Sequence, residues 1–420
     1  MSTEKRLAFI CYRDADSGPI AQILYDQLSA KLGRDRLFLA PESIGGGKEF
    51  TPEIEEALAA AVAMVVLIGP TWLSCTNGEG QRRLEQPYDW VVREIHAALE
   101  RQIPIIPVLL DGAARPSDET LPAKIKELSK YQSFRCHTRR GQSQELEPED
   151  VETLHSDLDM YLSPIKGPHS YQTSDRAIFK RLQRERELGE CLKALTHQEM
   201  RVCVLSGRTG CGKTSFIQAG VRSALDGPRS NSPIGIYVRF TREDPFRALR
   251  DALKAQLQLP TNALDGRDLQ SWFNEVAATC HSPIVLLLDQ FEEFLHGEQD
   301  VCGKFVDGLK HWYEHQSALP LKILFSIHSA DHLVRLFSQI GCYNRCQVDL
   351  LPFTRDQAFA SLKALAEAAD LLFHEPFVRA TVLDDIWDPE SDGILPLRLQ
   401  IVALAIQRHS KNNRGFTSEG

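Results

Sequence analysis

The sequence has no apolar stretch long enough to cross a membrane, and we do not expect its first residues to act as a secretory signal. Its longest unbroken apolar stretch runs from Ala57 to Ile68 and is closed by Gly69 and Pro70, well short of the ~20 residues that span a bilayer. Near the start of the chain, charge returns at Arg13 before a long apolar region can form. We therefore expect no transmembrane helix, no membrane partner and a cytoplasmic location.

Cysteine and positive charge are also too scarce for several classes of protein. The ten cysteines form no C-x-x-C pair, which argues against a disulfide scaffold, a zinc ribbon and a redox site, so we expect reduced thiols. Forty-eight basic against 57 acidic side chains give a formal net charge of −9. A negative net charge argues against a protein that binds nucleic acid over its whole surface. Only a local basic patch could do so.

The composition is that of a globular protein with a large core. Hydrophobic residues make up 43% of the chain and charged residues 25%, which excludes disordered and low-complexity classes. A chain of 420 residues is longer than a domain with one hydrophobic core usually is. At about 150 residues per domain, we expect two or three domains.

The first part of the chain, residues 1–162, alternates strand and helix patterns in the order of a parallel α/β sheet. Short apolar runs predict the strands, and apolar residues at helical spacing predict the helices. The expected strands are 7–12, 36–39, 64–68, 103–110 and 133–136, and the expected helices are 20–32, 50–63, 89–101 and 150–162.

A segment with two prolines and a glycine, residues 163–170, breaks this alternation. We expect an exposed linker over 163–178. A second α/β domain is predicted over 179–348, with strands at 202–205, 235–240, 284–289 and 322–327. Beyond it the strand pattern disappears, and amphipathic repeats predict a small helical lid region over 349–420.

A glycine-rich phosphate loop follows the first strand of the second domain. Gly207-Arg-Thr-Gly-Cys-Gly-Lys-Thr214 fits G-x-x-x-x-G-K-[ST] between an apolar strand and a helix. The glycines let successive backbone N–H groups face the phosphates, the lysine supplies charge, and the threonine hydroxyl can bind Mg²⁺. The predicted ATP-binding residues here are Gly207, Gly210, Gly212, Lys213, Thr214 and Ser215.

An apolar strand that ends in carboxylates completes this pattern. In Ile284-Val-Leu-Leu-Leu-Asp289-Gln-Phe-Glu292-Glu293, the strand delivers Asp289 to the metal edge of the phosphate site. We therefore predict Thr214 and Asp289 as the Mg²⁺ residues. Glu292 and Glu293 are both candidates for the base that polarises the attacking water, with Glu293 slightly behind. For either one, a solvated loop carboxylate is an equal alternative.

These motifs, with DQFEE and the later Gly393-Ile-Leu-Pro396, resemble the STAND class of P-loop signalling ATPases over residues 175–410. The resemblance implies that Pro396 is the lid residue through which nucleotide is sensed. The R-x-x-E-L part of the segment before the P-loop is kept at Arg184–Leu188, but Gln183 replaces the usual glycine. His328 stands where relatives usually carry an arginine that senses the γ-phosphate. Because histidine is only partly charged at neutral pH, we expect slow ATP turnover.

The first domain resembles a bacterial TIR domain over nearly its whole length, which implies a flavodoxin-like sheet. Phe9-Ile-Cys-Tyr-Arg13 matches the first-strand box, Phe38–Gly47 matches the BB loop, and Asp89–Ile95 matches the helix with the catalytic glutamate of NAD-cleaving relatives. The resemblance implies catalysis by Glu94. The expected NAD⁺-binding residues are Arg13, Ser43 and Trp90. Cys11 and Ala40 depart from the usual serine and aspartate.

The chemistry of the glutamate can be argued independently. Nicotinamide leaves NAD⁺ as a neutral molecule, so the bond needs no general acid and one carboxylate suffices. That carboxylate can stabilise the oxocarbenium-like charge that grows on the ribose. Trp90 and Glu94 share a helical face at four-residue spacing, which places an aromatic wall beside the carboxylate. Arg13 is expected to pair with a phosphate or with Glu94, the alternative being a surface pair with Asp14 or Asp16.

Three interpretations of function remain open. The first is an NAD⁺ glycohydrolase effector, forming linear or cyclic ADP-ribose, controlled by an ATP-dependent oligomerisation switch as in bacterial antiphage immunity. The second is a TIR scaffold that only recruits other TIR domains, with Glu94 idle. The third, ranked lowest, makes ATP hydrolysis the function and the TIR domain the sensor. In each case, the trigger lies either in a further part of the protein or in a separate partner.

Overall fold

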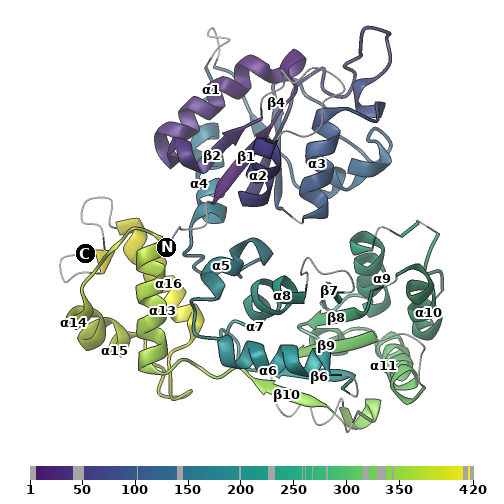
Figure 1. The fold of residues 1–420 in the computed structure, drawn as a ribbon, viewed down its shortest axis with the longest axis vertical. Coiled ribbons are helices and arrows are strands. Elements are labelled where there is room, and N and C mark those ends of the chain that lie inside the picture. Colours follow the sequence, from purple (N-terminus) through teal and green to yellow (C-terminus); the bar gives the residue numbers. More distant parts are fainter. Residues whose placement is uncertain are drawn as a thin grey trace. The chain divides into compact units, whose positions relative to one another are not determined.

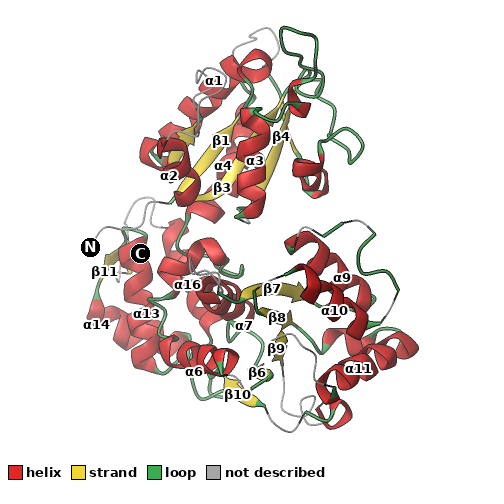
Figure 2. Ribbon diagram, turned by 45° about the vertical axis from the view of Figure 1, so that its right-hand side comes forward, coloured by secondary structure: helices red, strands yellow, loops and turns green. Residues whose placement is uncertain are grey.

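The computed structural model describes most of the chain, in two compact units, Met1–Pro164 and Ile165–Gly420 (Figure 1). We describe each unit by itself. Figure 2 shows that each contains a sheet covered by helices on both faces. The described residues are 6–40, 52–101, 103–139, 145–197, 200–225, 232–257, 259–260, 262–266, 268–280, 282–315, 321–328, 337–342, 345–409 and 415–416. Among them, no helix combines the length and the apolar character that crossing a bilayer requires.

The sheet of the first unit is parallel throughout, with strand order β2-β1-β3-β4-β5. This confirms the predicted α/β class, and each of the five predicted strands is present. The strands are β1 (Leu7–Cys11), β2 (Leu37–Leu39), β3 (Ala61–Ile68), β4 (Ile105–Leu110) and β5 (Phe134–Cys136). Both faces of β1 and β3 are buried, as is usual where crossover helices cover a parallel sheet.

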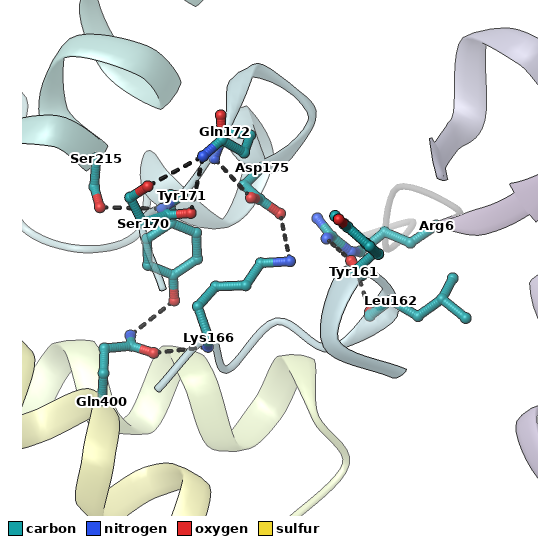
Figure 3. A network of polar contacts seen from close by, with 10 residues as sticks. All are labelled: Arg6, Tyr161, Leu162, Lys166, Ser170, Tyr171, Gln172, Asp175, Ser215 and Gln400. Atoms are coloured by element: carbon teal, nitrogen blue, oxygen red, sulfur yellow. Dashed lines mark hydrogen bonds and ion pairs between the residues drawn. The ribbon is translucent and has the colours of Figure 1, made fainter. Parts of the chain in front are cut away.

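Helices cover both faces of this sheet. Along β1, Ala8 and Ile10 point toward α1 (Asp14–Leu32) and α4 (Pro148–Leu162). The alternate residues of the strand, with Phe9 at the centre, pack against α2 (Pro52–Ala60) and α3 (Trp90–Glu100). At the end of α4, the Arg6 guanidinium donates to the carbonyls of Tyr161 and Leu162 (Figure 3), which satisfies acceptors that the helix leaves open.

Two elements of this unit begin three or more residues away from their predicted first residue. Helix α1 begins at Asp14 rather than at residue 20, because its first turn is polar and carries no apolar periodicity. Strand β3 begins at Ala61 rather than at residue 64, because the alanines that precede the β-branched run extend the strand against β1. Neither shift changes the order of the elements.

The second unit contains another parallel sheet, with strand order β10-β6-β9-β8-β7. Four of these strands were predicted. The edge strand β10 was missed because it is short and two of its four residues are polar. The strands are β6 (Val202–Ser206), β7 (Ile234–Arg239), β8 (Ile284–Asp289), β9 (Leu321–Ile327) and β10 (Cys346–Asp349).

Helices also cover both faces of this second sheet. Helices α9 (Pro245–Gln256), α10 (Leu269–Thr279) and α11 (Gln299–Glu314) pack on one face. The other face is covered by α6 (Glu185–Thr196) and by the helix after the P-loop. That helix runs from α7 (Lys213–Ser215) through a π-helical turn (Phe216–Arg222) to α8 (Ser223–Leu225).

The last part of the unit is mainly helical, as predicted. It comprises α13 (Arg355–Ala368), α14 (Glu375–Phe377), α15 (Leu383–Asp385) and α16 (Pro396–His409). Contrary to our expectation of no strands here, β11 (Leu372–Phe373) and β12 (Gly415–Phe416) form a small parallel pair. Two residues per strand are too few for an alternating pattern to be recognised.

The segment expected to be an exposed linker is instead largely buried in the second unit. Ile165, Lys166, Tyr171 and Asp175 are buried, and the short helix α5 (Arg176–Phe179) contributes Phe179 to the core. The prolines and the glycine led us to expect a solvated connection, but here they shape a folded strap. We use the term strap for residues 165–175.

Gln183 lies in the left-handed region at φ 57°, at the position where the family pattern has glycine. A side chain in this region costs about 1 kcal/mol or more, because Cβ crowds the following carbonyl. We expect Gln183→Gly to raise the free energy of unfolding of the second unit by about 0.5 to 1 kcal/mol, after the entropy cost of glycine. Denaturant titration measures this.

The matched control is Glu190→Gly, at an exposed position inside α6. Because glycine in a helix interior is unfavourable, this variant should lose about 1 kcal/mol. A loss of stability in Gln183→Gly similar to that of the control would show that residue 183 is not strained.

Candidate functional site

The phosphate loop connects β6 to the helix that follows it, as the motif requires. Gly210 and Gly212 have φ of 85° and 86°, a region that side chains rarely adopt, so both positions need glycine. The Lys213 ammonium donates to the carbonyl of Gly207 at 2.6 Å, and burial lowers the pKa of Lys213. The lysine thus sits inside the loop, where an incoming phosphate can exchange with the carbonyl.

Asp289 is fully buried at the end of β8, and three donors hold it. The Thr214 hydroxyl donates to its Oδ2 at 2.7 Å, and the Tyr237 hydroxyl donates to the same oxygen at 3.0 Å. The Gln290 backbone N–H donates to Oδ1 at 3.1 Å. Burial is the main cause that raises the pKa of Tyr237, so this hydroxyl remains a donor. A hydroxyl beside a carboxylate offers the hard oxygen ligands that Mg²⁺ prefers.

The two candidate bases differ in their surroundings. Glu292 is 8% exposed and lines the same cavity as Lys213, and its Oε2 has no hydrogen-bond partner among the described residues. Burial raises the pKa of Glu292, which suits a proton acceptor. The Glu293 side chain is 42% exposed and pairs loosely with Arg242 at 3.9 Å. The geometry therefore favours Glu292.

His328 lies at the exposed rim of the same cavity, directly after β9. Its Nδ1 is 3.2 Å from the Thr209 hydroxyl of the phosphate loop. Because His328 directly follows β9, its side chain lies beside the phosphate loop. A residue that senses the terminal phosphate would have to lie there.

Helix α16 begins against the phosphate loop. Pro396 is its first residue, and a Cβ added to Gly212 would lie 4.0 Å from the Pro396 ring. The backbone N–H of Leu397 donates to the carbonyl of Gly210 at 3.1 Å. The lid therefore contacts the loop directly, and Pro396 and Leu397 line the cavity with it.

The strap is held between the lid and the P-loop helix (Figure 3). Gln400 of α16 accepts from the Lys166 backbone N–H at 2.9 Å and donates to the Tyr171 hydroxyl at 2.7 Å. The Tyr171 backbone N–H donates to the Ser215 hydroxyl at 3.0 Å. The Lys166 ammonium pairs with buried Asp175 at 3.2 Å. The predicted residue Ser215 thus binds the strap and also lines the cavity.

One cavity of about 430 Å³ brings these elements together, a volume suited to a small ligand. Most of the predicted nucleotide residues line it, with the strap and the lid. They are Gly210, Gly212, Lys213, Thr214, Ser215, Asp289, Glu292, Glu293, His328 and Pro396. Gly207 instead contributes the carbonyl that binds Lys213.

In the first unit, the predicted residues gather where β1 ends beside the start of α3. Arg13 is fully buried and forms a two-pronged ion pair with Asp89, at 2.9 and 3.0 Å. Asp89 is also the N-cap of α3, and its Oδ1 accepts from the Val92 backbone N–H at 3.0 Å. Arg13 therefore anchors this helix. Its full burial rules out the alternative of a surface arginine, whereas a contact with Glu94 or a phosphate stays a prediction.

Glu94 lies on the next turn of α3 and is 4% exposed. The Cys11 thiol hydrogen-bonds Glu94, and burial, followed by the Glu94 charge, raises the pKa of Cys11 well above its usual range. Trp90 is half-buried, with the Arg93 guanidinium 4.7 Å from its ring centroid. Ser43 lies outside the described residues.

Three contributors to these sites were missed from the sequence. Tyr237 lies 52 positions before the carboxylate that it contacts, Asp89 pairs with a residue 76 positions away, and Gln400 contacts a segment more than 220 positions away. Only the Asp89 position carried a local signal, because an aspartate directly before a helix is a common N-cap.

The loop after β6, the carboxylate at the end of β8 and the lid together define a P-loop NTPase unit, preceded by a second α/β unit. The family model "Novel STAND NTPase 1" matches residues 164–419, and a TIR domain model matches residues 8–148. The chain belongs to this STAND NTPase family and carries a TIR domain before it. Both resemblances drawn from the sequence are thereby confirmed.

Comparisons with solved structures gave distant similarities. A Walker-type ATPase of Pyrococcus abyssi is 17% identical over 58% of this chain and 71% of its own, with a TM-score of 0.42. Cdc6p of Pyrobaculum aerophilum is 21% identical over 56% and 67%, with a TM-score of 0.41. The TIR domains of the activated Roq1 resistosome are 14% identical over 36% and 98%, with a TM-score of 0.26. A comparison with curated proteins gave no match.

Proposed function

We propose that the chain is an NAD⁺ glycohydrolase whose TIR domain is controlled by ATP-dependent self-association of its NTPase unit. The observation that carries the proposal is the anchoring of Glu94. Its helix is capped by Asp89, which Arg13 fixes from the end of β1 through two hydrogen bonds. A carboxylate fixed in this way fits electrostatic stabilisation, which needs a preorganised group. In a bacterium, NAD⁺ loss through such an enzyme would serve antiphage immunity.

The reaction breaks the bond between the nicotinamide ring nitrogen and C1′ of the ribose. The bonding electron pair leaves with nicotinamide and neutralises its pyridinium charge. Positive charge grows on the ribose, where the carboxylate of Glu94 opposes it. Water then adds at C1′ and releases a proton, giving ADP-ribose; attack by a ring nitrogen of the adenine instead gives the cyclic product. Trp90, on the same helical face, would pack beside the substrate, and Ser43 stays a predicted NAD⁺-binding residue.

The nucleotide site supports the regulatory half of the proposal. Lys213 would bind the phosphates of ATP, and Thr214 and Asp289 would hold Mg²⁺. When bound, the ion neutralises charge on the β- and γ-phosphates. Glu292, with its raised pKa and unpartnered Oε2 among the described residues, would orient the attacking water. Because Leu397 donates directly to Gly210, occupancy of the loop can bias the position of the lid.

The second candidate is a TIR scaffold without catalysis, with self-association as its output. The observation that favours it is the low exposure of Glu94, which at 4% offers a substrate little contact until its surroundings move. A trigger from a separate partner or a further part of the protein would serve either candidate.

The position of His328 leads to a prediction about ATP turnover. A neutral imidazole supplies one N–H donor, whereas an arginine supplies permanent charge and can contribute about 10³ to 10⁵ in phosphoryl transfer. The parent protein should therefore hydrolyse ATP slowly. We expect His328→Arg to raise the steady-state ATPase rate by about tenfold, since the histidine already provides part of the stabilisation.

The matched control is His296→Arg, which adds the same charge at another histidine of the cavity lining. It should leave the ATPase rate near that of the parent. Rapid hydrolysis by the parent, or an equal gain in both variants, would contradict a specific role for His328 at the terminal phosphate.

The direct test of the proposed activity is a time course of NAD⁺ and nicotinamide with the purified chain and ATP. If the chain is an NAD⁺ glycohydrolase, one nicotinamide should appear for each NAD⁺ that is lost. Unchanged NAD⁺ in particles that have assembled would favour the scaffold instead.

A further inference from the structure

Ser361 lies near the middle of α13, and its hydroxyl is buried without a hydrogen-bond partner among the described residues. The residue is 0% exposed, and its Oγ has no hydrogen-bond partner in the described part of the chain. A serine inside a helix can point to solvent or bond back to the carbonyl four residues earlier, but this buried hydroxyl does neither. A buried hydroxyl without a partner costs roughly 1–3 kcal/mol, so such a group in a site calls for a ligand.

The hydroxyl belongs to the nucleotide cavity. Ser361 lines that cavity together with Lys213 and Asp289, although it comes from the lid and they come from the ATPase core. No motif in the sequence singled it out, because a serine within an amphipathic helix has no local signal of function. Its role depends on the packing of α13 against the core.

The surroundings of Ser361 are those of a nucleobase and not of a phosphate. Helix α13 packs against α5, and the Glu367 carboxylate of α13 pairs with Arg181 just after α5. Phe179 of α5 and the neighbouring Leu182 line the cavity as apolar walls. Apolar and aromatic walls with a small number of polar groups, here Ser361 and Arg184, are the usual setting for an aromatic ligand.

The phosphate end of the cavity is held by other elements. Lys213 begins the helix after the phosphate loop, and Glu292 follows the end of β8; both line the part of the cavity where the triphosphate would bind. The Phe179 ring packs edge-on against Phe216, which follows the phosphate loop by one helical turn, with centroids 6.2 Å apart. The apolar end therefore continues from the phosphate end along the P-loop helix, as a nucleoside continues from its phosphates.

We infer that Ser361 is a base-reading residue, whose hydroxyl hydrogen-bonds the polar edge of the purine of the bound nucleotide. The inference rests on the proposed ATP site and adds to it the lid residue that contacts the base. A hydroxyl can accept from an exocyclic amino group or donate to a ring nitrogen, and either bond satisfies the buried Oγ. Because the contact comes from the lid, it would also join base recognition to lid position.

The test compares ATP with inorganic tripolyphosphate, which has phosphates but no base, by titration calorimetry. For Ser361→Ala we expect ATP affinity to fall about fivefold, the scale of one neutral hydrogen bond, with tripolyphosphate affinity unchanged. The matched control is Ser326→Ala in β9, because Ser326 is equally buried and its Oγ is likewise unpartnered among the described residues, but it does not line the cavity. The control should leave both affinities unchanged.

Thermal unfolding without nucleotide separates a ligand role from a structural one. Removing an unpartnered hydroxyl should leave the midpoint of Ser361→Ala equal to that of the parent or above it. Unchanged ATP affinity, an equal loss for tripolyphosphate, or a lowered midpoint would overturn the inference while leaving the ATP site in place. A parent that binds neither probe would overturn the proposed ATP site, and this inference with it.

Discussion

Glu94→Gln should reduce NAD⁺ cleavage by a factor of about 10² to 10³, the scale of one electrostatic stabiliser lost from a transition state. The substitution keeps the shape of the side chain and removes only the charge that opposes the oxocarbenium ion. It leaves the Arg13–Asp89 pair in place, so helix α3 should keep its cap. Nicotinamide release from the purified variant measures the effect.

The matched control is Glu100→Gln, at the exposed end of the same helix. Its rate should match that of the parent, and both variants should unfold at nearly the parent's midpoint. Cleavage by Glu94→Gln within a few-fold of the parent would contradict the assignment of Glu94. A fall in its midpoint alongside the rate would point to a structural role instead.

Lys213→Ala should weaken ATP binding by about 10²-fold, because a buried charge pair contributes on this scale. It should also reduce NAD⁺ cleavage, although Lys213 lies in the other unit. The reason is linkage: if ATP favours the assembled state, a variant that binds ATP poorly must populate that state less at the same ATP concentration. ATP titration and nicotinamide release on one preparation measure both effects.

Lys310→Ala is the matched control, since Lys310 is an exposed lysine of α11 that pairs with Glu314. It should change neither ATP affinity nor cleavage. Full, ATP-independent cleavage by Lys213→Ala would mean that the two units are not coupled.

The sequence was sufficient wherever a feature is local. The phosphate loop needs Gly210 and Gly212 at positive φ beside Lys213, and all of these lie within one short motif. Asp289 follows from an apolar run that ends in a carboxylate. Strands β1, β3 and β4 of the first unit were predicted for the same reason, because buried parallel strands form continuous apolar runs.

Features that depend on tertiary packing could not be predicted in this way. The strap has the composition of an exposed turn, yet Gln400 and Ser215 hold it, and both lie far away in the chain. The pair between Arg13 and Asp89 was not predicted, because Asp89 is brought to Arg13 only when α3 packs on the sheet. The choice between Glu292 and Glu293 also needed the fold, because both line the cavity and only the structure shows that Glu292 is buried and Glu293 is exposed.

The central claim is that ATP binding in the second unit controls NAD⁺ cleavage in the first. The most direct test measures particle mass and NAD⁺ cleavage together during an ATP titration. At fixed protein concentration, the account predicts that particles of several copies appear as ATP rises and that cleavage per chain rises with them. In the absence of ATP, single copies should leave NAD⁺ nearly intact. Equal cleavage by single copies without ATP would contradict the account.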